Sequence, residues 1–599
     1  MPASSTHLRS RPRQLCVLAA ALAAAALMTP CHCWPTFGRK RTRLLDSYDY
    51  VIVGGGSAGS VLANRLSADP GNNVLLLEAG GPETVAEQVP FLAPFLATEA
   101  NTWGYKTVPQ KDACLGFPER RAGMTQGKVL GGSSVLNSMS FVRGNRKDYD
   151  TWQDGYGAHG WSYEDVLPVF KEIETYYIRN PGQYHGTSGE IPVNYANTHT
   201  SLSDAFLKAC NESGYLYVDY NGRRQSGYSR VEANVAHGTR QSANRCFLSP
   251  VRRKRPNLHI SLYSLATKVT FEGKRASGVK FTKNCKVGFV AATREVIVSA
   301  GAINSAKLLL LSGVGPRQDL ETLKIPVVAD LPVGRGLQDH VVFTGLVVTT
   351  PKDEVGVFNI SAIQQYAYNR TGVLAIPGGT EVILFTSSQH RRGADDFPDI
   401  QTVLTDLFPG DMPPRPPQVS QEVYERYYKP MEGKKGFMAT LVMIQPKSRG
   451  TVTLNATNPS DQPLIDPRFL SQAEDVKRTV KGIMKIRKLL EADGLRNIGA
   501  KLWDVPYPPC LRAGSVWSAA YLDCFLRQTG FPAMHVCCTC AMGNHSLAVV
   551  DERLRVKGGV TGLRVADASV MPAVTTGNTN APVLMIGAKA AAIILKDNA

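Results

Sequence analysis

The stretch Asp49-Tyr-Val-Ile-Val-Gly-Gly-Gly-Ser-Ala-Gly59 predicts the fold of this 599-residue chain. It opens with a short apolar run rich in β-branched side chains, which is typical of a buried strand. A turn of three glycines follows at once, and Ser60 to Ala68 has the apolar spacing of a helix. Asn73-Val-Leu-Leu-Leu-Glu78 predicts a second buried strand that ends in an acidic residue. Together these segments form a strand–turn–helix–strand unit with the GxGxxG spacing of dinucleotide-binding folds.

The glycines and the acid have physical roles in such a site. Gly54 allows the tight turn, Gly56 lets the backbone approach a pyrophosphate, and Gly59 lets helix and strand pack closely. Glu78 can accept hydrogen bonds from both ribose hydroxyls, and its charge would repel a 2′-phosphate. The start of the helix presents unpaired N–H groups to the phosphates, which adds Ser57 and Ala58 to the expected contacts. The unit therefore predicts an adenine dinucleotide.

A second loop rich in Gly and Ser spans Gly127-Lys-Val-Leu-Gly-Gly-Ser-Ser-Val-Leu-Asn137. Taken alone, such a loop is typical of an ordinary surface turn. Its small residues followed by an amide would also suit backbone that runs close against a flat ring system and hydrogen-bonds it. The residues of the loop leave both interpretations open.

The first 45 residues contain no Asp or Glu, and three arginines precede an apolar run from Leu15 to Met28. A basic segment, a short apolar run and a break are typical of a secretory signal peptide, which we assign to residues 1–33. An uncleaved signal anchor and a mitochondrial transit peptide are the alternatives. The run is short for a bilayer span and too apolar for an amphipathic transit helix. We therefore expect a secreted protein, with a mitochondrial location as the alternative, and no stable membrane span in the mature chain.

Export would make N-glycosylation available to the chain. Five Asn-x-Ser/Thr sequons occur, at Asn211, Asn359, Asn369, Asn455 and Asn544. Asn544 lies in the C-terminal segment that carries the candidate catalytic residues, so we expect it to remain unmodified.

Nine of the twelve cysteines lie beyond the leader, and an odd number leaves at least one free thiol or an intermolecular bond. Cys510 and Cys524 flank one short segment and are the first pair to test as a disulfide. A histidine and three cysteines gather in one segment without the paired CxxC spacing of zinc sites: His535, Cys537, Cys538 and Cys540. We therefore predict no metal site.

The formal net charge of the chain is +17, which is high for an enzyme. The basic residues are scattered rather than interleaved with aromatic residues in one stripe. Nucleic-acid binding would need such a stripe or a recognisable motif, so we expect no nucleic-acid partner.

Further segments resemble a known family. Gly127 to Asp150 fits the first signature of the glucose–methanol–choline (GMC) oxidoreductases, a family of FAD enzymes, and Gly301 to Gly315 fits the second. Val333 to His340 also matches, as does a C-terminal block from Gly562 to Pro572 and from Gly577 to Asn580.

The resemblance runs from about Tyr48 to Lys596, with small departures. Ala306 stands where the family usually has Pro or Ser, and Gly336 stands where it usually has Asn. Within the family, Asn101-Thr-Trp-Gly-Tyr105 is most like the arthropod glucose-dehydrogenase branch.

The resemblance implies an α/β chain, α+β overall, in which a discontinuous Rossmann-like FAD-binding domain joins a substrate domain built on an antiparallel sheet. The expected N-terminal FAD-binding region is 47–343, of which 152–233 contributes to the substrate domain. Residues 344–443 form the expected substrate-domain segment, and 444–590 form the C-terminal region with the catalytic residues.

By the same resemblance, the flavin would contact a set of loop and strand residues: Gly54, Gly56, Ser57, Ala58, Gly59, Glu78, Ser133, Asn137, Ser138, Met139, Ser140, Val269, Asp567 and Ala568. Val269 lies in a predicted strand, Lys268 to Phe271, where its backbone would contact the adenine.

The segment His535-Val-Cys-Cys-Thr-Cys-Ala-Met-Gly543 resembles the family motif His-x-x-Gly-Thr-Cys-x-Met-Gly, whose first His is the catalytic base. The partner position, His or Asn in the family, is Asn578. Chemistry supports both roles, because a neutral imidazole can take the hydroxyl proton of an alcohol and an amide donor can hold the oxygen. Cys538 replaces the Gly of the motif, and a Cys there would be strained if the backbone φ is positive.

These residues predict an FAD-dependent oxidoreductase that takes a hydride from the CH–OH group of an alcohol or sugar and passes electrons to a quinone-like acceptor. A choline dehydrogenase is one alternative, but choline needs an aromatic and carboxylate cage that the sequence does not place. A lyase on the same fold, in which FAD is structural, and a non-catalytic flavoprotein are the others.

Some members of the family attach FAD covalently through a His just before the signature Asn, and Leu136 stands at that position here. We therefore predict a dissociable FAD. Acid precipitation of the holoprotein should leave a colourless pellet and release the flavin into the supernatant, where its absorbance is measured. A pellet that stays yellow would contradict this prediction.

Overall fold

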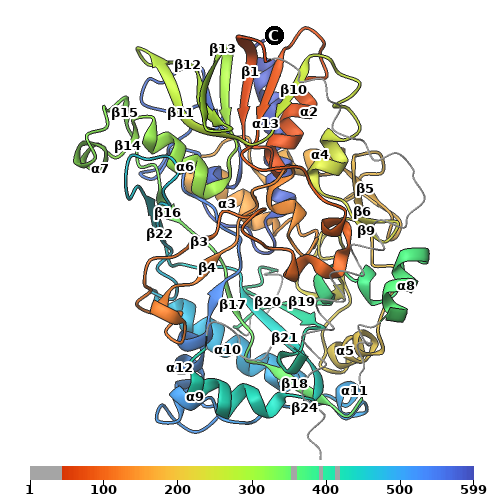
Figure 1. Ribbon diagram of the computed structural model, residues 1–599. Helices are drawn as coiled ribbons and strands as arrows, with labels where there is room; N and C mark the ends of the chain where they lie inside the picture. The colour runs from red at the N-terminus through yellow and green to blue at the C-terminus, as the bar shows by residue number, and fades with distance from the viewer. Residues whose placement is uncertain (1–43, 353–359, 390–395, 412–418) are drawn as a thin grey trace, which may run out of the picture.

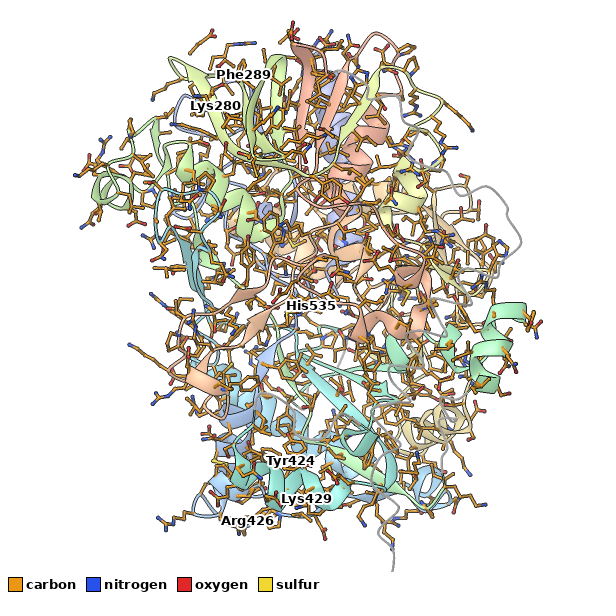
Figure 2. All side chains as sticks on the ribbon, in the orientation of Figure 1. Lys280, Phe289, Tyr424, Arg426, Lys429 and His535 are labelled. Carbon is orange, nitrogen blue, oxygen red and sulfur yellow. A yellow bond between two sulfur atoms is a disulfide. The ribbon has the colours of Figure 1, made fainter. Side chains whose placement is uncertain are left out.

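A computed structural model describes residues 44–352, 360–389, 396–411 and 419–599. The predicted signal peptide 1–33 and the sequon at Asn359 lie outside these ranges. Two large β-sheets organise the described chain, one towards each end of the molecule as it is drawn in Figure 1. His535 lies between them (Figure 2).

The first sheet contains the predicted strand–turn–helix–strand unit. β1 (Ser47–Val53) pairs in parallel with β2 (Val74–Leu77), and α2 (Ser57–Leu66) connects them. β10 (Leu258–Ser261) pairs in parallel with β2, and β13 (Lys286–Val298) pairs in parallel with β1. β26 (Leu563–Val565) pairs in parallel with the end of β13. The carboxyl ends of these strands therefore meet at one edge of the sheet.

β13 is much longer than its continuous apolar run, which begins at Val296. Its first half pairs antiparallel with β12 (Arg275–Lys283), which in turn pairs antiparallel with β11 (Ser264–Glu272). Many side chains of this half are exposed, so it lacks the continuous apolar run of the buried half. Only the half of β13 that is covered on both faces therefore has the apolar pattern of a buried strand.

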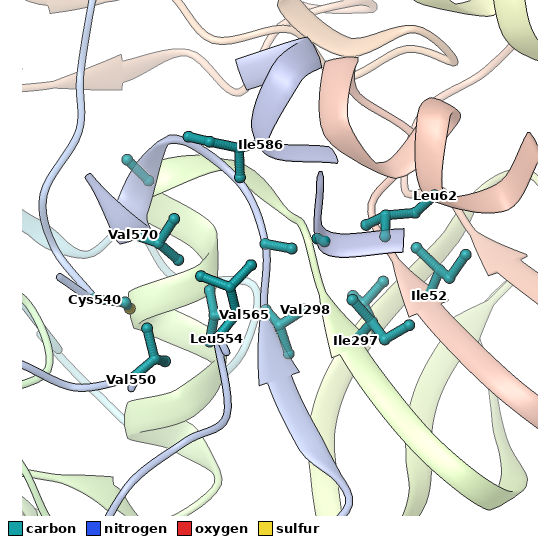
Figure 3. Packing of buried hydrophobic residues seen from close by; sticks show 14 of the residues in the cluster. Ile52, Leu62, Ile297, Val298, Cys540, Val550, Leu554, Val565, Val570 and Ile586 are labelled. Atoms are coloured by element: carbon teal, nitrogen blue, oxygen red, sulfur yellow. The ribbon is translucent and has the colours of Figure 1, made fainter. Parts of the chain in front are cut away.

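Apolar side chains of the first sheet pack against α2, and α13 (Asn580–Asp597) packs against α2. Figure 3 shows part of this core, with side chains from β1, α2, β13, β26 and α13 in one buried cluster: Ile52, Leu62, Ile297, Val298, Val565 and Ile586. A Cβ atom on Gly587 would lie 2.8 Å from the carbonyl oxygen of Ala58. The missing side chain therefore allows the two helices to approach closely.

The second sheet is built on three long antiparallel strands, β19 (Thr380–Thr386), β20 (Ile400–Thr405) and β21 (Lys435–Met443). Shorter strands extend it, also in antiparallel pairs: β7 (Gly227–Arg230), β17 (Val341–Phe343), β18 (Val347–Thr350), β24 (Lys501–Leu502) and β25 (Phe531–Pro532). Helices α5 (Ser201–Glu212) and α10 (Ala473–Leu489) pack against it, and α12 (Ala519–Thr529) packs against α10 (Figure 1).

The predicted fold class is confirmed, because a discontinuous sheet with a parallel part is joined to an antiparallel sheet. The first sheet takes strands from both ends of the chain, at 47–298 and at 563–565. Segment 152–233 is divided between the two parts: α4 (Tyr163–Ile173) packs against α13, whereas β7 joins the second sheet. The domain boundaries themselves stay a prediction.

No helix within the described ranges is long and apolar enough to cross a membrane. Cys510 and Cys524 form a disulfide, as the sequence suggested, which ties the middle of α12 to the turn Pro508–Cys510. The other described cysteines are free thiols, and of these Cys285 is exposed.

The disulfide closes a loop with a sequence separation of 14 residues. Replacing both Cys510 and Cys524 by Ala should lower the free energy of unfolding by about 3 kcal/mol, because the unfolded chain gains the entropy of the open loop. Urea denaturation of the two proteins measures the difference. Cys285→Ala, at an exposed thiol, is the matched control and should leave the denaturation midpoint unchanged. Equal midpoints for the double variant and the parent would contradict the prediction.

Candidate active site

A large cavity opens at the carboxyl ends of the parallel strands. Residues at or just after the ends of β1, β2, β13 and β26 line it: Val53, Gly54, Leu77, Glu78, Ser299, Ala300, Asp567 and Ala568. It holds about 1460 Å³ of empty space, which includes space open to solvent. Its position at the carboxyl ends of the strands suits a dinucleotide.

The glycine turn after β1 has the geometry that the sequence predicted. Gly54 has a φ of +102°, and a Cβ atom there would lie 2.5 Å from the carbonyl oxygen of Ser299. A Cβ atom on Gly59 would lie 1.9 Å from the carbonyl oxygen of Gly54, so only Gly lets the helix pack here. A Cβ atom on Gly56 would meet nothing closer than the Gly132 Cα, at 3.9 Å. The protein therefore leaves the space beside Gly56 free on the cavity side, as a pyrophosphate requires.

Glu78 lies at the end of β2 and lines the cavity. Its Oε2 accepts a hydrogen bond from Gly55 N at 2.8 Å, and its Oε1 accepts one from Gly80 N at 2.7 Å. Burial raises the pKa of this carboxyl to about 6, and the backbone N–H groups act in the opposite direction. Each oxygen keeps a lone pair, so the residue can still accept from a ribose hydroxyl.

The second glycine loop lines the same cavity, through Gly132, Ser133 and the run from Asn137 to Ser140. The Oδ1 of Asn137 accepts hydrogen bonds from Met139 N at 3.0 Å and from Arg240 Nη1 at 2.9 Å. Its Nδ2 donors are thereby left for a group in the cavity. Of the two interpretations of this loop, the structure supports backbone and an amide placed against a ligand.

Twelve of the fourteen predicted cofactor contacts line the cavity, and Gly59 and Val269 do not. Gly59 supports the turn from behind. Val269 is fully buried, and its N–H donates to Ser312 Oγ at 2.9 Å. Strand β11 lines the cavity instead at its beginning, through Ser264, Leu265 and Ala266.

The two candidate catalytic residues lie next to each other in the cavity wall. His535 follows β25, and Asn578 lies just before α13. The Nδ2 of Asn578 lies 3.1 Å from the Nε2 of His535, and the Oδ1 of Asn578 accepts from Gln401 Nε2 at 3.1 Å. Burial lowers the pKa of His535 to about 4, so its imidazole is neutral at neutral pH.

Residues that the sequence did not single out support this pair from behind. The backbone N–H of His535 donates to Asp339 Oδ1 at 2.7 Å, and the Nδ1 of His535 lies 2.9 Å from the Nδ1 of His340. Burial raises the pKa of Asp339 to about 8. Asp339 and His340 are the last two residues of the segment Val333 to His340. The family resemblance of this segment was the one sign in the sequence that they could matter to the site.

Cys538 has a φ of +75°, so the condition for strain is met. Its side chain is fully buried behind the cavity wall rather than in it. Its N–H donates to Ala568 O at 3.2 Å, and its Sγ donates to Gln338 Oε1 at 3.8 Å. The extra side chain therefore does not narrow the cavity.

Within the described part of the chain, no group of three or more His, Cys, Asp or Glu side chains is arranged to hold a metal ion. His535 uses both ring nitrogens in contacts with His340 and Asn578.

The fold and the cavity define a class of protein, a dinucleotide-dependent oxidoreductase with a His–Asn pair at the cofactor site. The chain matches the family described as GMC oxidoreductase over residues 48–342 and 446–587. It belongs to this family and is an FAD-dependent oxidoreductase. The resemblance noted in the sequence is confirmed.

Relatives span almost the whole chain. A glucose dehydrogenase (FAD, quinone) of Drosophila pseudoobscura pseudoobscura is 37% identical, covering 93% of this chain and 89% of its own length. An oxygen-dependent choline dehydrogenase of Burkholderia cenocepacia (strain HI2424) is 37% identical, covering 91% and 93%. The crystal structure of pyridoxine 4-oxidase from Mesorbium loti superposes with a TM-score of 0.78 at 29% identity, over 91% of this chain and 99% of that one.

The residues present fit FAD. The open space at Gly56 would take the pyrophosphate, Glu78 the ribose, and the donors of Asn137 the ring system. Asp567 lines the cavity but its carboxylate already accepts from Gly301 N, Ser305 Oγ and Ser569 N. Its Oδ1, which accepts from Ser569 N, keeps a lone pair, so Asp567 stays a predicted contact of FAD.

Gly56→Ala tests whether the space at the turn is reserved for the cofactor. The new methyl group meets no close protein atom, so the free energy of unfolding of the apoprotein should change by less than about 0.5 kcal/mol. FAD binding, measured by quenching of flavin fluorescence, should weaken at least about 10-fold because the methyl group meets the pyrophosphate. Gly59→Ala is the matched control, and it should destabilise the apoprotein itself by about 1–3 kcal/mol. Unchanged FAD affinity in Gly56→Ala would place the pyrophosphate elsewhere.

Proposed function

We propose that this enzyme oxidises the CH–OH group of an alcohol or sugar, with His535 as the base and Asn578 as the residue that holds the oxygen. The observation that carries the proposal is the 3.1 Å contact between His535 Nε2 and Asn578 Nδ2 in the cavity that the dinucleotide turn also lines. A hydroxyl group that displaces this contact can donate its proton to the Nε2 of His535 and accept from the Nδ2 of Asn578.

Each residue contributes to moving the proton off the hydroxyl group. His535 is neutral at neutral pH because burial lowers its pKa, so its Nε2 lone pair is available. Asn578 can stabilise negative charge that develops on the oxygen, and Gln401 holds its amide in the donating orientation. Bound FAD supplies the two-electron acceptor for the hydride from the carbinol carbon.

We take an alcohol or sugar as the proposed substrate and keep choline as the alternative. Choline recognition needs aromatic faces and a carboxylate around the quaternary ammonium. Among the described lining residues, Trp103 is the one Phe, Trp or Tyr, and Glu78 and Asp567 are the carboxylates. Both carboxylates lie at the strand ends and accept from backbone N–H groups. The relative named glucose dehydrogenase (FAD, quinone) supports a sugar or alcohol as substrate and a quinone-like acceptor.

The same proposal includes export of the enzyme. The Cys510–Cys524 disulfide supports it, because disulfides persist in oxidising compartments. The asparagines of the four described sequons are exposed, at Asn211, Asn369, Asn455 and Asn544. We retain Asn544 as unmodified, since it lies next to α3 (Arg146–Tyr156) and its N–H donates to Tyr156 O at 2.9 Å.

Anaerobic bleaching of the flavin by sugars, alcohols and sterols in turn tests the reaction. His535→Ala should lower the rate of bleaching by the best substrate by about 10² to 10⁴-fold, the contribution of a positioned base, while FAD content stays the same. His545→Ala is the control, because His545 lies in the same segment, hydrogen-bonds to Met542 O and does not line the cavity. Its rate should equal that of the parent.

The alternatives give different results in the same experiment. A lyase would convert its substrate without bleaching the flavin, and a non-catalytic flavoprotein would do neither. A His535→Ala rate close to that of the parent would contradict the assignment of the base.

A further inference from the structure

A second histidine lies directly behind the proposed base. The Nδ1 atoms of His340 and His535 are 2.9 Å apart although the residues are 195 positions apart in sequence, and their rings are nearly perpendicular at 84°. His340 immediately precedes β17 and is fully buried. It does not line the cavity, so it acts on a substrate only through His535.

The contact between the two Nδ1 atoms has room for one proton. A neutral imidazole carries its proton on one ring nitrogen and a lone pair on the other, and a hydrogen bond needs one of each. If His535 donates from Nδ1, its Nε2 carries the lone pair and can act as a base. If His340 donates instead, the Nε2 of His535 carries the proton and cannot take another. The direction of this hydrogen bond therefore decides whether His535 is competent.

At the buried end, the Nε2 of His340 has no hydrogen-bond partner among the described residues. The direction of the contact with His535 is therefore argued from the other end, at the cavity.

At the cavity end, the neighbouring amide groups favour the direction in which His535 donates to His340. Gln401 Nε2 donates to Asn578 Oδ1 at 3.1 Å, which turns the N–H groups of Asn578 towards His535 Nε2. A lone pair on this nitrogen is what such a donor requires. The hydrogen bonds run in one direction from Gln401 through Asn578 and His535 to His340.

We propose that His340 is a positioning residue that fixes His535 in the tautomer with an unprotonated Nε2. The inference rests on the proposed function of His535 as the base. His340 keeps the same role after the proton transfer, because its Nδ1 still accepts from the Nδ1–H of the imidazolium. The carboxyl group of Asp339 accepts from the backbone N–H of His535 and so fixes the backbone beside the two rings.

Two variants of His340 separate acceptance of a hydrogen bond from packing. In His340→Asn the side-chain Oδ1 lies about where the Nδ1 was and can accept from His535. In His340→Leu the volume is largely filled but no acceptor remains. We expect the Leu variant to bleach the flavin about 100-fold more slowly at saturating substrate, and the Asn variant to stay within about 5-fold of the parent. KM and FAD content should change little in either, because His340 itself does not line the cavity.

Rescue by Asn is the readout that a purely structural role would not give. If the Leu and Asn variants have equal rates with intact FAD content, the inference is wrong. His340→Ala replaces the Leu variant if the latter fails to bind FAD, and the same difference from Asn is expected. The proposed function fails separately, through a His535→Ala variant that keeps the parental rate.

Discussion

The parallel pairing of β26 with β13 is the contact on which the site depends. Three residue pairs, from Val296–Leu563 to Val298–Val565, bring the C-terminal region into a sheet that begins at Ser47. The pairing places Asp567 at the carboxyl edge, where its carboxylate accepts from Gly301 N and Ser305 Oγ at the start of α6 (Gly301–Leu311). The chain then continues from this edge to Asn578 and α13. The dinucleotide turn and the His–Asn pair share one cavity because the chain returns to this sheet.

Features whose physics is local could be predicted from the sequence, and features that depend on packing between distant segments could not. The tight turn at Gly54 and the close approach at Gly59 follow from residues a few positions apart, and both are present. Val269 was expected at the cofactor, but the residues of β11 that line the cavity come earlier in the strand. The N–H of Val269 donates to Ser312 Oγ instead. The contact of His340 with His535 spans 195 positions, so no local pattern marks it. The matched segment that ends at His340 indicated its importance but not its partner.

Burial both enables and limits the proposed base. It keeps His535 neutral, which leaves a lone pair for the substrate proton. Lowering the pKa from 6.5 to about 4 also means that the protonated form is disfavoured by about 3 kcal/mol. A proton taken from substrate therefore needs acceptors that offset this cost. His340 offers one at Nδ1, and it stays neutral itself because burial and the neighbouring His535 both lower its pKa.

Among the departures from the family motifs, Cys538 raised the strongest doubt that the enzyme is active. A left-handed non-Gly residue costs on the order of 1 kcal/mol, and the structure does contain that strain. The thiol lies outside the cavity, however, and donates to Gln338 Oε1, which also accepts from Val574 N at 3.1 Å. Cys538 thus contacts the residue that joins the His535 segment to the one leading to Asn578. The strain is local, and the contact with Gln338 helps to hold His535 and Asn578 in place. The Cys at this position therefore changes how the two residues are held and does not remove their catalytic function.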